Sequence, residues 1–292
     1  MTLWNQKSTC SALTAALLSL SLLAGCGGES AAVPSQTPAP AAETPAITSP
    51  AVETPAGEEK TAEKGKAAVD WSHAPEGYLL ARPGEGEKRW KLRVTKAAEY
   101  TYDLTGKGWT AIPLSEGDGT YTAAVFEQVE GTAYLPILTA EFDVELTDPL
   151  SPFLRPNQQV DYTTAPLTLA RAAELTADAA DDGEKTKRIY EFVSTTLRYD
   201  DDQAESVQSG YIPALDEVLQ REKGICLDFA ALMTAMCRSQ GLPCRLVVGD
   251  AGRAYHAWTE VWDGETWVRY DPTFAASGKD ASGVEYVPKF YY

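Results

Sequence analysis

The chain is poor in basic residues and in histidine. Among its 292 residues, lysine and arginine number 25 against 42 aspartates and glutamates, and the formal net charge is −17. A nucleic-acid partner needs a basic face to neutralise its phosphates, so this composition argues against nucleic-acid binding. His73 and His256 are the two histidines. No cluster of histidines and cysteines has the spacing of metal ligands, and we therefore predict no metal and no cofactor.

Apolar runs long enough to span a membrane are also missing from the N-terminal region. The apolar run at residues 12–23 follows the basic residue Lys7 and is too short to cross a bilayer. It leads into Leu23-Ala24-Gly25-Cys26, which resembles the lipobox of bacterial lipoproteins. We therefore expect residues 1–26 to be a lipoprotein signal peptide and Cys26 to carry lipid chains. Such an anchor would hold the protein on the extracytoplasmic face of the cell membrane.

Residues 27–69 contain no aromatic residue and are rich in proline, alanine and threonine. A segment with so little to bury is predicted to be a disordered linker. From residue 70 to residue 156 the pattern changes to short β-branched and aromatic runs separated by glycine turns, which predicts a small β-sandwich-like accessory domain. The expected strands are residues 90–95, 100–104, 109–112, 121–126, 133–138 and 142–146.

Residues 157–292 mix helical and strand patterns. Helices are predicted at residues 167–180, 184–197 and 226–240, with a short one at 214–221, and strands at 245–248, 255–262 and 266–271. The helix at 226–240 has an apolar stripe made by Phe229, Leu232, Met233 and Met236. The aromatic tail, which includes Tyr286 and Phe290, is expected to dock on the core.

Cys226 is predicted to lie in the first turn of its helix. The unpaired N–H groups and the helix dipole favour an anion there, so we expect this thiol to ionise readily to the nucleophilic thiolate. Cys237 and Cys244 are interpreted as small buried apolar residues. Their spacing leaves open whether they form a disulfide bond.

His256 and Asp271 are predicted to meet across a β-hairpin. Asp263-Gly264 is a typical two-residue turn, and with that turn His256 would lie directly opposite Asp271. A four-residue loop would make the two residues diagonal neighbours on the same face of the sheet. A three-residue loop without a bulge would place them on opposite faces. In the first two cases the carboxylate can orient the imidazole as a general base for the thiol.

Three segments together resemble the transglutaminase-like superfamily: Gly224-Ile225-Cys226-Leu227-Asp228-Phe229-Ala230, Tyr255-His256-Ala257-Trp258 and Tyr270-Asp271-Pro272-Thr273. The likeness extends over roughly residues 161–274. It implies an α+β, papain-like core in which a helix that bears the cysteine packs on an antiparallel sheet. It also implies that Cys226 is the nucleophile, His256 the base and Asp271 the group that orients the base.

The resemblance further implies acyl transfer from an amide through a thioester, with a peptide or protein as substrate. The oxyanion would be stabilised by the N–H of Cys226 and by a side-chain donor, for which Tyr199 and Gln220 are the candidates. Because water is abundant outside the cell, we expect hydrolysis rather than amine transfer. The alternatives are a transamidase that cross-links surface proteins or wall peptides, and a non-catalytic binding module. The sequence does not indicate an oligomeric state.

Overall fold

The structure is a computed structural model that describes residue 55 and residues 60–278 and 281–292. All of these residues belong to one compact unit. The predicted signal peptide, Cys26 and most of the predicted linker lie outside the described residues.

Two four-stranded antiparallel sheets enclose the first hydrophobic core, in which Leu79, Leu92, Ile112 and Val125 are fully buried. The arrangement is a β sandwich, as predicted. The first sheet has the order β1 (Thr61–Lys64), β2 (Ala67–Asp70), β3 (Tyr78–Arg82) and β6 (Thr110–Pro113). The second has the order β5 (Glu99–Leu104), β4 (Trp90–Thr95), β7 (Gly119–Glu130) and β8 (Ala133–Val144).

Two details of the sandwich differ from the sequence prediction. The prediction that the disordered linker extends to residue 69 was wrong. β1 pairs with β2 there, and Ala67, Ala68 and Val69 are fully buried. These small residues lack the aromatic signal of a strand. The predicted strands at 133–138 and 142–146 form the single strand β8. Pro136 is tolerated within β8 because the strand lies at the edge of its sheet.

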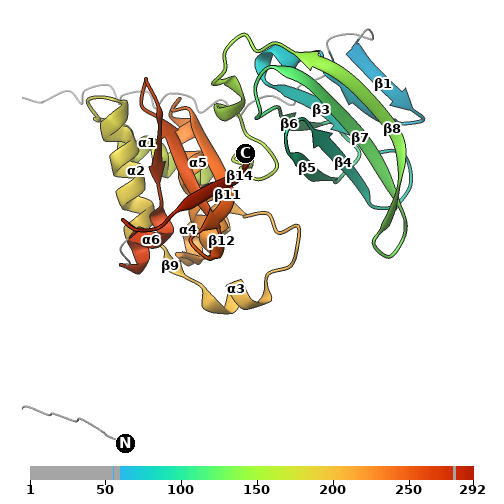
Figure 1. Ribbon diagram of the computed structural model, residues 1–292. Helices are drawn as coiled ribbons and strands as arrows, with labels where there is room; N and C mark the ends of the chain where they lie inside the picture. The colour runs from blue at the N-terminus through green and yellow to red at the C-terminus, as the bar shows by residue number, and fades with distance from the viewer. Residues whose placement is uncertain (1–54, 56–59, 279–280) are drawn as a thin grey trace, which may run out of the picture. The chain divides into compact units, whose positions relative to one another are not determined.

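The second hydrophobic core is built around α5 (Cys226–Ser239). Every residue of α5 from Asp228 to Arg238 is buried, which is more than the single apolar stripe predicted from the sequence. α1 (Pro166–Thr176) and α2 (Asp182–Thr196) pack on α5, and a four-stranded antiparallel sheet contacts it as well (Figure 1). This sheet has the order β13 (Trp267–Tyr270), β12 (Ala254–Trp262), β11 (Cys244–Ala251) and β14 (Tyr286–Tyr291).

Short elements complete the chain. They are the 3₁₀ helices η2 (Ala74–Glu76) and η3 (Ser151–Phe153), the helices α3 (Asp201–Ser206), α4 (Leu215–Arg221) and α6 (Pro272–Ser277), and the strands β9 (Arg198–Tyr199) and β10 (Lys223–Gly224). β9 and β10 form a parallel pair that leads directly into α5. The fold class is therefore α+β, with the predicted helix-on-sheet core after a β sandwich.

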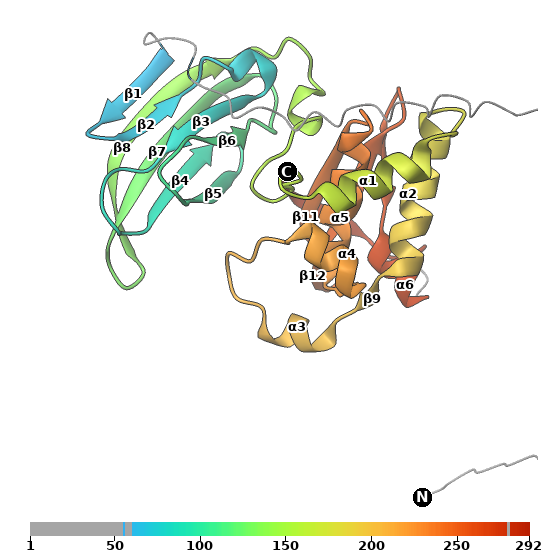
Figure 2. The same cartoon turned by 180° about the vertical axis from the view of Figure 1, so that it is seen from behind.

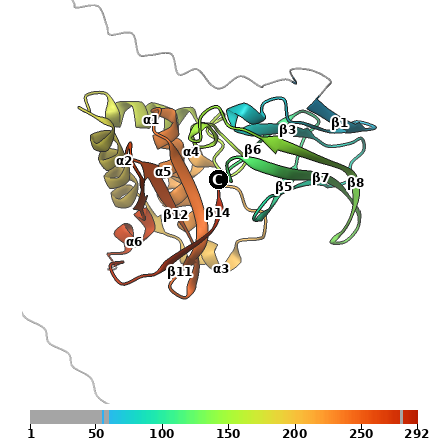
Figure 3. The ribbon, with the colours of Figure 1, turned by 45° about the horizontal axis from the view of Figure 1, so that its top comes forward.

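The aromatic C-terminal segment docks on both cores. Figure 3 shows β14 running alongside β11, with which it pairs. Phe290 and Tyr292 pack against both hydrophobic clusters, and the ring centroid of Tyr100 lies 5.4 Å from that of Phe290. The side chains at the end of β14 thus contribute to the sandwich core and to the core around α5.

Arg238, in the last turn of α5, ties three separate segments together. Its guanidinium donates to the backbone oxygens of Cys244 at 2.7 Å, Arg155 at 2.7 Å and Tyr292 at 2.6 Å. The residue is 3% exposed, and burial lowers the pKa of its guanidinium. A planar group with several fixed donors suits this role better than an ammonium group does.

Replacing Arg238 by methionine should destabilise the fold strongly. The three carbonyl oxygens would lose a donor inside the protein, and each loss costs about 1–3 kcal/mol, so we expect the free energy of unfolding to fall by about 3 kcal/mol or more. Denaturant unfolding measures this change. Arg253→Met, at an exposed position, is the matched control and should change stability little. Equal stability of the two variants would contradict the proposed role of Arg238.

Candidate active site

Cys226 is the first residue of α5, as the sequence predicts. Its N–H, at the first helical position, has no acceptor within the helix. The preceding N–H, that of Ile225, donates to Oδ2 of Asp228 at 2.8 Å. A Cβ on Gly224 would lie 2.6 Å from the Cβ of Asp228, so only glycine allows this close approach. The half-buried thiol of Cys226 is thus held at a capped helix start.

His256 lies on β12, and its Nε2 is 2.8 Å from Oδ2 of Asp271. The hairpin between them is not the two-residue turn that we expected first. Trp262 pairs with Trp267, which leaves a four-residue loop closed by a hydrogen bond from Asp263 N–H to the Thr266 oxygen. The Asp263 carboxylate accepts two further N–H groups of this loop and so favours the longer turn. The sequence had allowed for this loop, which makes His256 and Asp271 diagonal neighbours.

Asp271 is held from three directions. Oδ1 accepts the N–H of Phe274 at 3.0 Å and so caps α6, which starts at the next residue. Oδ2 accepts a hydrogen bond from the Tyr286 hydroxyl at 2.8 Å and also lies 2.8 Å from Nε2 of His256. Asp271 is 8% exposed, as is His256. Its position is therefore determined by β12, α6 and β14 together.

The protonation of His256 reflects this environment. Burial alone would lower the pKa of the imidazole, but the hydrogen bonds with Asp271 and Cys226 and the negative charges of these two groups outweigh it and raise the pKa to about 9. Because Asp271 engages Nε2, Nδ1 is the ring nitrogen left for Cys226. The imidazole is thus placed between a thiol and a carboxylate and holds a proton at neutral pH.

The two candidates for the oxyanion donor lie in different places. Tyr199, on β9, pairs with Gly224, two residues before Cys226. Burial raises the pKa of its phenol, and the charge of Cys226 adds to this shift. Gln220 has an exposed side chain on α4 and makes no hydrogen bond among the described residues. Tyr199 therefore lies beside the strand that leads into Cys226, whereas Gln220 is exposed on α4.

Two features near the candidate site have no clear signal in the sequence. The role of Tyr286 was not predicted, because its partner Asp271 is reached only when β14 pairs with β11. Helix α3 was also missed, because Asp201–Ser206 is a short, polar segment without apolar periodicity. The Asp200 side chain accepts the N–H of Gln203 and caps this helix. An aspartate three residues before a glutamine could have indicated the helix start.

Cys237 and Cys244 are both buried free thiols in the structure. Within the described residues, no group of three or more histidine, cysteine, aspartate and glutamate side chains is placed to hold a metal ion. No helix among these residues has the length and apolar character needed to cross a membrane.

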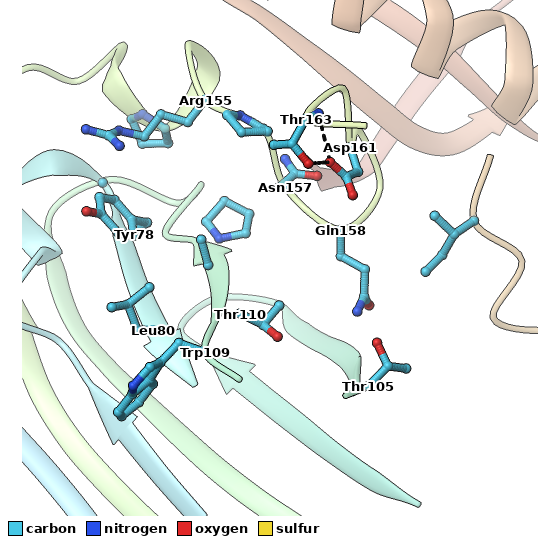
Figure 4. A pocket seen from close by; sticks show the side chains of 16 residues that line it. Tyr78, Leu80, Thr105, Trp109, Thr110, Arg155, Asn157, Gln158, Asp161 and Thr163 are labelled. Atoms are coloured by element: carbon cyan, nitrogen blue, oxygen red, sulfur yellow. Dashed lines mark hydrogen bonds between the residues drawn. The ribbon is translucent and has the colours of Figure 1, made fainter. Parts of the chain in front are cut away.

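A cavity of about 410 Å³ lies between strands of the sandwich and the connector that follows η3 (Figure 4). Tyr78, Trp109, Asn157 and Ile212 are among its lining residues. The Asp161 side chain accepts hydrogen bonds from Thr163 at its rim (Figure 4). Cys226, His256 and Asp271 do not line this cavity, so the thiol site is a separate feature of the molecule.

Comparison with known families assigns the domain that carries these residues. The family model of the transglutaminase-like superfamily matches residues 169–272, a range that includes Cys226, His256 and Asp271. Residues 169–272 belong to the transglutaminase-like superfamily. The helix-on-sheet architecture around α5 is thus the fold of a transglutaminase-like domain.

Several individual proteins resemble the chain at low similarity. An uncharacterized protein of Mycobacterium leprae is 40% identical over 70 residues, which is 20% of this chain and 24% of that protein's length. A solved candidate cysteine protease from Cytophaga hutchinsonii is 14% identical, with a TM-score of 0.41 over 74% of this chain and 83% of that one. The periplasmic domain of TgpA from Pseudomonas aeruginosa is 15% identical, with a TM-score of 0.37 over 78% and 97% of the two chains.

Asp271→Asn should lower the pKa of His256. Asparagine can still cap α6, but it removes the negative charge that favours the imidazolium, so we expect a fall of about one to three pH units from the wild-type pKa. NMR titration of the imidazole in the transglutaminase-like domain of the intact chain measures it. Asp263→Asn, in the exposed hairpin loop, is the control and should leave the pKa unchanged. An unaltered pKa in Asp271→Asn would show that the carboxylate does not support the imidazolium.

Proposed function

We propose that the protein is a thiol enzyme that cleaves amide bonds of peptides or proteins through a thioester on Cys226. The observation that carries this proposal is the placement of His256 between the carboxylate of Asp271, at 2.8 Å, and the thiol of Cys226. A nucleophile, a base and a group that orients the base are the parts that covalent catalysis requires. The transglutaminase-like family of the domain agrees with this chemistry.

The first half of the reaction forms the thioester. The sulfur of Cys226 attacks the amide carbon, and the negative oxygen that develops is stabilised by the N–H of Cys226 and, in our proposal, by the Tyr199 hydroxyl. The imidazolium of His256 then gives its Nδ1 proton to the leaving amine as the C–N bond breaks. Asp271 keeps the ring in the orientation that this transfer needs.

The second half of the reaction consumes the thioester. His256, now neutral, takes a proton from water as the water oxygen attacks the carbonyl carbon, and the C–S bond breaks to release the acid. Cys226 is half-buried rather than enclosed, which leaves water access to the thioester. This exposure favours hydrolysis over transfer to an amine.

We further propose that the enzyme works on the extracytoplasmic side of a membrane, anchored by lipid at Cys26. The support is the sequence Leu23-Ala24-Gly25-Cys26 after an apolar run. A linker rich in proline and alanine then separates the lipid from the folded part. The substrates in this view are peptides or proteins at the cell surface.

Cys226→Ala and His256→Ala should abolish amide cleavage in a surface-protein extract. Loss of either member of a catalytic set lowers the rate by about 10³-fold to 10⁶-fold, because the remaining members cannot act alone. New amino termini are counted by mass spectrometry in the presence of a labelled amine. Hydrolysis predicts new termini without incorporated label.

His73→Ala is the matched control for His256→Ala, because His73 lies in the sandwich and stacks on Tyr78. This variant should retain full activity. Label incorporation without cleavage would instead identify a transamidase. Identical profiles for wild type and Cys226→Ala would remove the case for catalysis.

Cys26→Ser should release the protein from the membrane fraction. Lipid chains on the cysteine sulfur cannot form on serine, so membrane association should be lost while the fold is retained. Labelling of producing cells with a fatty-acid analogue, followed by fractionation, measures both effects. Cys10→Ser, in the part expected to be removed, should behave as wild type. Labelling that persists in Cys26→Ser would contradict the proposed anchor.

A further inference from the structure

Residues 201–212, here called the α3 segment, bury almost none of their side-chain surface. Ten of these twelve residues are exposed, and helix α3 has no buried residue. Figures 1 and 2 show the segment as an excursion that leaves the domain after β9 and returns before α4. The two residues that are not exposed are Gln203 and Tyr211. Apolar packing therefore contributes little to holding this segment in place.

Both of these residues bond to the same carboxylate. The Tyr211 hydroxyl donates to Oδ1 of Asp228 at 2.6 Å, and Nε2 of Gln203 donates to Oδ2 at 3.0 Å. Arg221 reaches Oδ2 at 3.4 Å and also contacts the side-chain oxygens of Gln203 and Tyr211. Asp228 is fully buried. A single buried carboxylate thus holds both ends of the α3 segment.

The same carboxylate also organises the start of the cysteine helix. Asp228 is the third residue of α5 and accepts the N–H of Ile225, the residue before Cys226. The α3 segment therefore attaches two residues away from the proposed nucleophile. Tyr199, which pairs with Gly224 two residues before Cys226, comes two residues before the segment begins.

The segment has a firm attachment at each end. Asp200 donates its N–H to the Gly224 oxygen at 2.9 Å and forms an ion pair with Lys223 at 2.9 Å. Pro213, at the other end, is buried. Between these points Ile212 borders the cavity described above rather than a packed core. Hydrogen bonds hold this segment where apolar packing does not, so breaking them would free the segment without unfolding the domain.

We propose that the α3 segment is a flap of the active site, latched beside Cys226 by the bonds of Gln203 and Tyr211 to Asp228. In the latched state the flap narrows the approach to the thiol, and its release admits a polypeptide chain. Asp228 is then a positioning residue, which acts on Cys226 through Ile225 and on the flap through the two latch side chains. The purpose of the flap rests on the proposed function, whereas its release can be measured without any substrate.

The test is the double variant Gln203→Ala/Tyr211→Phe in the full chain. Both substitutions remove latch bonds and leave Cys226, His256 and Asp228 in place. Hydrogen exchange of the backbone amides in the flap should accelerate about tenfold or more, while the buried backbone amides of α5 keep their slow exchange. Gln208→Ala is the matched control, since the Gln208 side chain donates to the Ser206 oxygen within the flap and not to Asp228.

Access to the thiol is measured with two maleimides that share one reactive group. N-ethylmaleimide is small, and a polyethylene-glycol maleimide is bulky; alkylation of Cys226 is followed by peptide mass spectrometry. In the double variant the rate ratio of bulky to small reagent should rise at least about tenfold over wild type and Gln208→Ala, because the latch bonds are lost. An unchanged ratio, or unchanged exchange in the flap, overturns the proposal.

Failure of the flap and failure of the proposed function give different results. If N-ethylmaleimide alkylates Cys226 equally fast in wild type and in His256→Ala, activation of the thiol fails, whatever the flap does. Suppose instead that His256→Ala slows alkylation but the bulky-to-small rate ratio is the same in the double variant and in the wild type. The thiol is then activated, and the flap does not control access to it. A slower reaction with both maleimides in the double variant would show damage to the nucleophile and would also overturn the proposal.

Discussion

The contact between His256 and Asp271 is the interaction on which the candidate site depends. The Asp271 carboxylate caps α6, accepts the Tyr286 hydroxyl and holds the imidazole, so three elements meet at one side chain. The negative charge also offsets the burial that would otherwise discharge the imidazole. Asp271 therefore has a structural and an electrostatic role: it caps helix α6, and it favours the protonated form of His256.

A second buried carboxylate plays the corresponding part at the nucleophile. Asp228 accepts hydrogen bonds from Tyr211, Gln203 and the N–H of Ile225, and it sits against Gly224. A buried charge must be hydrogen-bonded to be tolerated, and here its donors come from the segment before the helix as well as from the helix start. Each side of the proposed reaction centre is thus organised by one aspartate, Asp271 behind the base and Asp228 behind the thiol.

Elements with a strong local pattern could be predicted from the sequence. The helix from Cys226, the strands on either side of Asp263-Gly264 and most of the sandwich strands agree with the structure, because periodicity and turn residues act over a few positions. The strand over Ala67–Asp70 was missed since its small residues become a strand only when β1 and β3 pair with it. The edge strand β8 was predicted as two separate strands, because apolar and polar residues alternate only weakly in its middle.

The amino-acid pattern alone identified the side chains that we propose for the chemistry: a cysteine at a helix start, a histidine in a strand and an aspartate after the return strand. It also determined that a loop of two or four residues would bring the last two to one face of the sheet. Tertiary packing fixed which loop forms, that Tyr199 pairs beside Gly224 while Gln220 stays exposed, and that Tyr286 reaches Asp271 and Tyr211 reaches Asp228. These contacts join segments whose separation along the chain leaves no periodic trace, so only the packed fold can specify them.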